Sequence, residues 1–149
     1  MPACLIPRNT NLIDMEGSVY GWGRFDHVLQ DLSNILKQTS LTIRPNIKCQ
    51  QFDLDQNMLC GLDAVSTSCQ GDSGGPLTVE MGGKHYLSGI VSFGEIDGCP
   101  LQVMKALCYS LHLSPAIFQA PVVYTSVSTM RDWIDEQTFN EDASIICSP

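Results

Sequence analysis

The sequence predicts an all-β domain that ends in one α-helix. Short runs of strand-forming residues are separated by glycine or proline, a pattern typical of antiparallel sheets. The clearest signal is a hairpin, in which Gly82-Gly83 separates predicted strands at 77–80 and 86–93. Apolar residues at helical spacing within 130–134 predict the closing helix.

The remaining elements are predicted in chain order. Residues 18–24 form a β-type run ended by glycines, and residues 41–43 form a strand stopped by Pro45. Apolar residues recur at helix-like spacing within 25–40, at Leu29, Leu32, Ile35 and Leu36. Near the C-terminus, Thr129 together with Asp132 predicts the N-cap of the closing helix.

Length and composition restrict the classes of function. A chain of 149 residues that is 44% hydrophobic can bury the core of one domain. Its net charge of −8 argues against nucleic acid as a partner, and no apolar run approaches the roughly 20 residues of a membrane span. The first residues lack a basic segment followed by an apolar stretch, so the sequence does not predict a signal peptide.

Seven cysteines are many for this length. They form no C-x-x-C pair and no cluster with histidine, so they indicate disulfides rather than metal, and hence a secreted protein. Residues 53–57 begin like a calcium loop, but Met58 and Ala64 stand where glycine and glutamate are required. We therefore predict neither a metal nor a cofactor.

The most informative stretch is CQGDSGGPL, from Cys69 to Leu77. Three glycines and a proline around Ser73 describe a tight turn that holds a hydroxyl in a fixed place. Such a turn can also direct successive backbone N–H groups at one point, as an oxyanion hole requires. The nine residues resemble the nucleophile loop of the chymotrypsin-like (trypsin family) serine proteases.

This resemblance implies the architecture. Residues 18–24 resemble the strand that opens the second barrel of that family, so we expect an antiparallel six-stranded β-barrel with a C-terminal α-helix, one half of a two-barrel domain. The predicted division is an inter-barrel connector at 1–12, the barrel and closing helix at 13–135 with an atypical insertion at 101–120, and a polar tail at 136–149.

The resemblance also implies roles. Ser73 is the expected nucleophile, and the backbone N–H groups of Gly71 and Ser73 are the expected oxyanion hole. Asp72 matches the carboxylate that pairs with the new N-terminus released by activation cleavage in the family.

Substrate contacts follow by the same resemblance. Thr67 stands where trypsin-like members carry aspartate, and Val122 replaces a frequent glycine opposite Gly94. A neutral, shortened S1 pocket favours small or medium apolar residues, as in elastases, with a chymotrypsin-like preference second. The full set of expected S1 and substrate-backbone contacts is Thr67, Ser68, Gln70, Ser92, Phe93, Gly94 and Val122.

Two disulfides are implied, Cys49–Cys60 and Cys69–Cys99. The family has a third bridge, but both of its cysteines are replaced in this chain, by Gly17 and Val79. Cys4 resembles the cysteine that bridges to an upstream propeptide or light chain. The pairing of Cys4, Cys108 and Cys147 stays open.

The family's histidine base and its orienting aspartate belong to the first barrel, whose motifs do not occur in this chain. None of His27, His85 and His112 matches that base. We therefore expect a serine endopeptidase acting on protein or peptide substrates, in a truncated form that is inactive alone. The alternatives are a non-catalytic homologue that serves as a binding or regulatory module, and a mis-spliced product that folds poorly.

Overall fold

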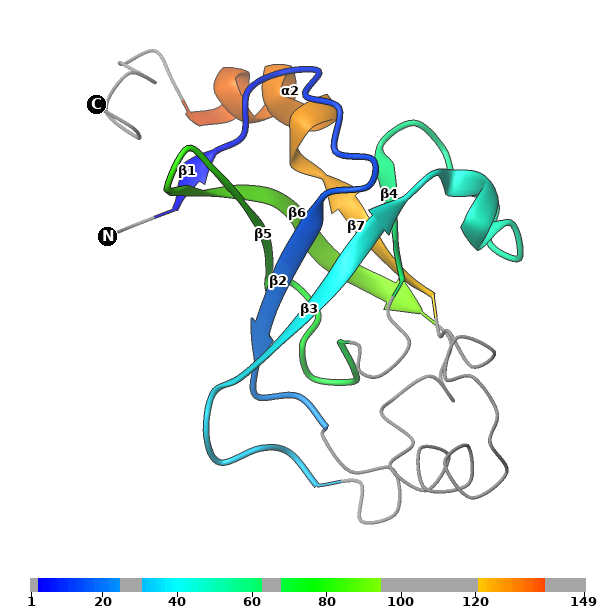
Figure 1. The fold of residues 1–149 in the computed structure, drawn as a ribbon, viewed down its shortest axis with the longest axis vertical. Helices are drawn as coiled ribbons and strands as arrows, with labels where there is room; N and C mark the ends of the chain where they lie inside the picture. The colour runs from blue at the N-terminus through cyan, green and yellow to red at the C-terminus, as the bar shows by residue number, and fades with distance from the viewer. Residues whose placement is uncertain (1–2, 25–30, 63–67, 95–120, 139–149) are drawn as a thin grey trace.

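The computed structural model describes residues 3–24, 31–62, 68–94 and 121–138 (Figure 1). In chain order the strands of this part are β1 (Cys4–Leu5), β2 (Glu16–Gly21), β3 (Lys37–Arg44), β4 (Met58–Leu62), β5 (Pro76–Met81), β6 (Lys84–Gly94) and β7 (Val122–Ser126). A 3₁₀ helix, η1 (Asn46–Cys49), precedes β4, and the α-helix α2 (Val127–Thr138) follows β7. None of the helices in these ranges is long and apolar enough to cross a membrane.

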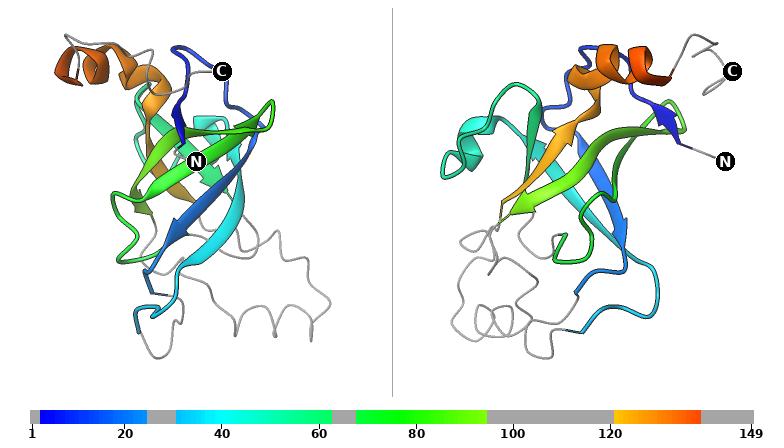
Figure 2. Two further views of the ribbon diagram at one scale, coloured as in Figure 1. Left: turned by 90° about the vertical axis from the view of Figure 1, so that its left-hand side faces the viewer. Right: turned by 180° about the vertical axis from the view of Figure 1, so that it is seen from behind.

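Six of the strands close into an antiparallel barrel in the order β6-β5-β2-β3-β4-β7, and β7 pairs again with β6. Strand β1 adds to β6 in parallel, through Cys4 with Tyr86 and Leu5 with Leu87. The two further views in Figure 2 show the strands crossing around one core, with α2 at one end of the barrel. The predicted six-stranded antiparallel barrel with a C-terminal helix is confirmed.

Alternating residues of the strands fill the barrel. The buried core consists of side chains from β2, β3, β5, β6 and β7 together with the connector and the start of α2: Ile6, Leu12, Val19, Leu41, Ile43, Leu77, Val79, Val91, Val122, Tyr124 and Val127. The period of two along β3, where Leu41 and Ile43 are buried and their neighbours are not, is typical of a half-buried strand.

The helix-like spacing within 25–40 does not produce a helix in its described part. Residues 31–36 contain no helix, and residues 37–40 belong to β3. Strand pairing overrides the local pattern, because β3 pairs with β2 along the whole length of β2, from Glu16 with Thr42 to Gly21 with Lys37. Leu32, Ile35 and Leu36 are more than half exposed, so they do not form the buried face of a helix.

Helix α2 begins earlier than predicted. It starts at Val127, directly after β7, and the hydroxyl of Ser126 accepts a hydrogen bond from the N–H of Thr129 at 3.4 Å. Ser126 therefore caps the helix, and the predicted cap at Thr129 is wrong by three residues. Because no loop separates β7 from α2, the last residue of the strand takes the capping position.

The connector packs against this helix. The guanidinium of Arg131 donates to the carbonyl of Ile6 at 2.7 Å, and Thr10 N–H donates to the hydroxyl of Ser128 at 2.9 Å. Helix α2 continues to Thr138, beyond position 136 at which the polar tail is predicted to begin. The insertion predicted at 101–120 lies outside the described residues, and the domain limits stay a prediction.

A disulfide joins Cys49 of η1 to Cys60 of β4, with Cα atoms 5.8 Å apart, as predicted. Both cysteines are fully buried, and Phe52 and Leu54 pack against them. Gly17 and Val79, the two positions at which a further bridge is replaced, are cross-strand partners on β2 and β5.

Candidate active site

The loop that carries Ser73 is held to the barrel by backbone hydrogen bonds. Gly74 N–H donates to the carbonyl of Val91 at 2.9 Å, and Val91 N–H donates to the carbonyl of Gly75 at 2.9 Å. This exchange extends the pairing of β5 with β6 by two residues and fixes the loop against β6. Ser73 lies on the exposed side of the loop.

Two glycines let the loop turn sharply. Gly71 has a φ of 97° and Gly74 a φ of 80°, both in the region that side-chain-bearing residues rarely adopt. The motif therefore requires glycine at these positions for its backbone geometry.

The carboxylate of Asp72 turns inward, away from Ser73. Its Oδ1 accepts a hydrogen bond from Gly23 N–H at 2.7 Å, and its Oδ2 accepts one from Cys69 N–H at 2.9 Å. Both oxygens thus have a backbone donor, one from the nucleophile loop and one from a segment 49 residues earlier. Such charge-assisted bonds are among the stronger ones in proteins.

Two peptide units of the loop, Gln70–Gly71 and Asp72–Ser73, are each anchored through their carbonyl. The carbonyl of Gln70 accepts from Arg24 N–H at 2.8 Å, and the carbonyl of Asp72 accepts from Gly75 N–H at 2.9 Å. Because a trans peptide directs its N–H opposite to its C=O, these bonds orient the N–H groups of Gly71 and Ser73. Neither of the two N–H groups donates to an acceptor in the described part of the chain.

A buried tyrosine lies behind this loop. The hydroxyls of Tyr124 and Ser68 are 3.2 Å apart and form a hydrogen bond, and Tyr124 is fully buried. Burial raises the pKa of Tyr124 to about 12, the hydrogen bond to Ser68 lowers this pKa, and the nearby Asp72 charge raises it. Tyr124 is therefore a neutral hydrogen-bonding partner across the physiological pH range.

Gly94 and Val122 lie directly opposite each other, as the last pair of β6 with β7. Val122 is buried, and its Cγ2 lies 3.2 Å from the position that a Cβ atom at Gly94 would take. The branched side chain thus fills space against the Gly94 backbone.

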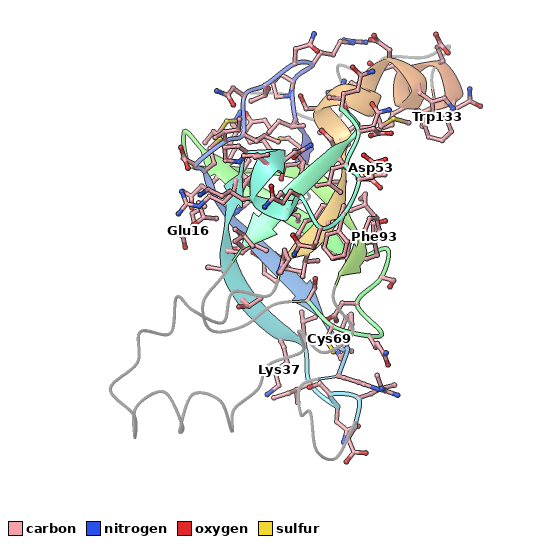
Figure 3. All side chains as sticks on the ribbon, turned by 90° about the vertical axis from the view of Figure 1, so that its right-hand side faces the viewer. Glu16, Lys37, Asp53, Cys69, Phe93 and Trp133 are labelled. Atoms are coloured by element: carbon pink, nitrogen blue, oxygen red, sulfur yellow. A yellow bond between two sulfur atoms is a disulfide. The ribbon has the colours of Figure 1, made fainter. Side chains whose placement is uncertain are left out.

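One side of the end of β6 has no strand partner in the part of the chain that the structure describes. Its pairing with β5 ends at Pro76 with Ile90, whereas its pairing with β7 continues through Phe93 and Gly94. Ser92 and Phe93 are exposed, and the Phe93 ring meets the Phe52 ring edge to face at a centroid distance of 5.4 Å. Figure 3 shows Phe93 at the end of β6, and Cys69 of the nucleophile loop at the same end of the barrel.

A comparison with protein-family models shows to which family the chain belongs. The Trypsin family model matches residues 1–134. The chain belongs to the trypsin family.

Curated relatives agree with this assignment. The chain is 35% identical over 144 residues to the human hepatocyte growth factor activator serine protease, covering 91% of the chain and 19% of that protein. It is 33% identical over 144 residues to rat chymotrypsin-C, covering 91% of the chain and 47% of the relative. Rat transmembrane protease serine 9 is 31% identical over 153 residues, which cover 97% of the chain and 13% of that protein. The chain therefore spans less than half the length of each of these relatives.

Of the remaining predicted site residues of this trypsin-family chain, some lie within the described ranges and others do not. Cys4 and Cys69 are each disulfide-bonded. Their partners are cysteines of this chain that lie outside the described residues. The pairing of Cys69 with Cys99 therefore stays a prediction, whereas the expected bridge from Cys4 to an upstream segment is wrong for this structure, because the Cys4 sulfur is already bonded within the chain. Thr67 and the histidines at 27 and 112 also fall outside those ranges.

Sequence reasoning missed two contributions. Arg24 acts through its backbone N–H, and any residue other than proline supplies that donor, so no side-chain signal was available. Tyr124 carried a weak signal, because a tyrosine within the apolar run of β7 needs a buried partner for its hydroxyl.

Proposed function

We propose that this chain supplies the nucleophile and the oxyanion hole of a serine endopeptidase. One observation carries the proposal: beside the exposed Ser73, the peptide units Gln70–Gly71 and Asp72–Ser73 are both anchored by their carbonyls. The N–H groups of Gly71 and Ser73, which have no acceptor among the described residues, can consequently bind an oxyanion beside the Ser73 hydroxyl.

In the proposed reaction, Ser73 Oγ attacks the carbonyl carbon of a peptide bond while its proton passes to a base. The negative charge that develops on the carbonyl oxygen is stabilised by the N–H groups of Gly71 and Ser73. Collapse of the tetrahedral intermediate breaks the C–N bond, the base returns the proton to the leaving amine, and an acyl-enzyme ester on Ser73 remains. Water then hydrolyses the ester by the same steps.

The base has to come from outside the described residues. His85 is the histidine in the described part, and it pairs with Glu80 beside the turn of the β5–β6 hairpin. Glu80 lies four residues beyond Pro76, a distance of about 13 Å along a strand. Because Ser73 precedes Pro76, the separation of Glu80 and His85 from Ser73 is larger still. We infer that a first-barrel segment supplies histidine and aspartate, and that this chain alone is inactive.

We propose a neutral S1 pocket that prefers small or medium apolar residues, with a chymotrypsin-like preference second. Thr67 would offer no charge to a lysine or arginine of the substrate, and the buried Val122 opposite Gly94 would shorten the pocket. The hydroxyl pair of Ser68 and Tyr124 is neutral and supports the same preference.

The proposed substrate is a protein or peptide in extended conformation. Residues 92–94 have no strand partner opposite β7 among the described residues, so this side can pair with the substrate backbone as an added strand. Such pairing gives affinity through main-chain hydrogen bonds. Gln70 and Phe93 have exposed side chains, and we propose that both contact the bound substrate. The disulfides favour a secreted protein.

A second candidate is a non-catalytic homologue that binds partners through the same barrel. The observation in its favour is the lack of a base within reach of Ser73 in the described ranges.

A fluorophosphonate probe distinguishes the two functions. It would be applied to the chain alone and to a fusion in which the chain replaces the matching part of rat chymotrypsin-C, which then supplies the first barrel. We expect labelling and hydrolysis after alanine or valine, but not after lysine, in the fusion only. Ser73→Ala should abolish labelling, and Ser40→Ala, which alters an exposed serine on β3, should leave it unchanged. A folded fusion that is not labelled at Ser73 would favour the non-catalytic homologue.

A further inference from the structure

Two glycines of β2 and the segment after it enclose the carboxylate of Asp72. A Cβ atom at Gly21 would lie 1.9 Å from Oδ1 of Asp72 and 2.7 Å from its Cγ. A Cβ atom at Gly23 would lie 2.5 Å from Cγ and 2.6 Å from Oδ2. The space that a side chain would occupy at either glycine is therefore already filled by the Asp72 carboxylate. We call these two residues the carboxylate cradle.

The requirement for glycine in the cradle is steric. Among the described glycines only Gly71, Gly74, Gly82 and Gly83 have a positive φ, so alanine could adopt the backbone of Gly21 and Gly23 without strain. The atoms nearest to an added side chain at either glycine belong to Asp72, whose carboxylate is itself held by the N–H groups of Gly23 and Cys69. Displacing it would break both hydrogen bonds.

The packing continues from the cradle to the nucleophile loop. A Cβ atom at Gly71 would lie 3.1 Å from the Cα atom of Gly23, so the two backbones are in close contact. On the other side, a Cβ atom at Gly75 would lie 2.8 Å from the carbonyl oxygen of Asp72. Asp72 is thus fixed through its side chain by the cradle and through its carbonyl by Gly75.

We propose that Gly21 and Gly23 are positioning residues for the chemistry of Ser73. They set the place of the Asp72 carboxylate, and Asp72 in turn sets the directions of the N–H groups of Gly71 and Ser73, which directly flank it. A side chain in the cradle moves Asp72 and thereby misaligns the oxyanion hole, without touching substrate. This inference rests on the proposed function of Ser73.

The kinetic test uses the chymotrypsin-C fusion with Gly23→Ala, and Gly17→Ala as the matched control. A Cβ atom at Gly17 would lie 2.6 Å from Cδ1 of Leu77, so the control adds a similar clash on β2, remote from Asp72. We expect Gly23→Ala to lower kcat about 100-fold, the effect of losing one oxyanion donor, and to lower kcat/KM equally. Gly17→Ala should change kcat little. Equal losses in the two variants would overturn the proposal.

A second measurement needs no activity. Urea unfolding of Gly23→Ala is compared in the native background and with Asp72→Ser, whose shorter side chain leaves room for a methyl group. We expect Gly23→Ala to destabilise the native background but to have little effect with Asp72→Ser, whereas Gly17→Ala should destabilise both backgrounds equally. Additive effects of Gly23→Ala would refute the cradle. If the effect of Gly23→Ala on stability depends on Asp72 but the fusion is not labelled at Ser73, the cradle is retained and the proposed function is rejected.

Discussion

The two ends of the barrel are held in place by different kinds of contact. At the end that carries Cys69 and Ser73, a carboxylate lies inside the chain and is held by backbone N–H groups and glycine packing. At the other end, where Trp133 marks helix α2 in Figure 3, the arginine side chain of the connector pairs with two aspartates of the helix at or near the surface.

This difference predicts how each end responds to substitution. Groups withdrawn from water lose most when a partner is removed, because water cannot replace it. Exposed ion pairs exchange readily with water and salt, so their removal has little effect. Substitutions that change single atoms should therefore destabilise the nucleophile end, whereas the helix end should tolerate the loss of its exposed side chains.

The largest effect is expected for Asp72→Asn. The amide keeps the shape of the carboxylate but turns an NH₂ group toward the N–H of Gly23 or of Cys69, so that two donors face each other. We expect a loss of about 1–3 kcal/mol in the free energy of unfolding, measured in urea. Labelling of Ser73 in the fusion should slow about 100-fold. An unchanged labelling rate would show that the carboxylate does not set the oxyanion hole.

Tyr124→Phe tests the same end through pH. Because the pKa of Tyr124 is raised to about 12 in the folded state from an ordinary value near 10, the folded protein holds a proton that the unfolded chain releases. The contribution of this proton to the free energy of unfolding is fully present below pH 10. It is lost as the pH rises from 10 to 12, by about 1.4 kcal/mol per pH unit. Thermal unfolding between pH 9 and 12 should show this decline, and Tyr124→Phe should flatten it. An equal decline in the variant would place the titration on another group.

Sequence alone predicted those parts that are local in the chain. Ser73, Asp72 and the glycines of their loop occupy consecutive positions, and Gly82-Gly83 marked its hairpin directly. The contacts of Asp72 with Gly23, and of Gln70 with Arg24, join segments that are more than 40 residues apart. No local pattern encodes them, because they arise only when the barrel brings β2 next to β5.

The wrong predictions have the same origin. Leu32, Ile35 and Leu36 have the spacing of a helix, yet β3 begins directly after them because its pairing with β2 overrides that pattern. Thr129 is a reasonable cap by composition, but the helix starts where β7 ends, and this point is set by the pairing of β7 with β4 and β6. Local propensity decided neither boundary.

At the helix end, Arg131→Ala should have an intermediate effect. Arg131 is only 12% exposed, and it donates to the carbonyl of Ile6 and pairs with Asp135 at 3.2 Å. Removing it leaves the Ile6 carbonyl and the carboxylate of Asp135 without this donor. We expect a loss of about 1–2 kcal/mol in urea unfolding, and no change in the labelling of Ser73 in the fusion. Slower labelling would show that the two ends of the barrel are coupled and do not respond independently to substitution.

Arg8→Ala should have the smallest effect, although Arg8 makes more ion pairs than Arg131. Its guanidinium pairs with Asp132 at 2.6 Å and also with Asp135, and the hydrogen bond to Asp132 raises the pKa of Arg8. The side chains of Arg8 and Asp132 are 52% and 82% exposed, so water and salt compete with these contacts. We expect the midpoint of thermal unfolding to be unchanged within error, both in dilute buffer and in 0.5 M NaCl. Arg8→Ala could instead lower the midpoint as much as Arg131→Ala does, with the difference disappearing in salt. That result would show that exposed charges stabilise the helix end as strongly as buried backbone donors stabilise the nucleophile end.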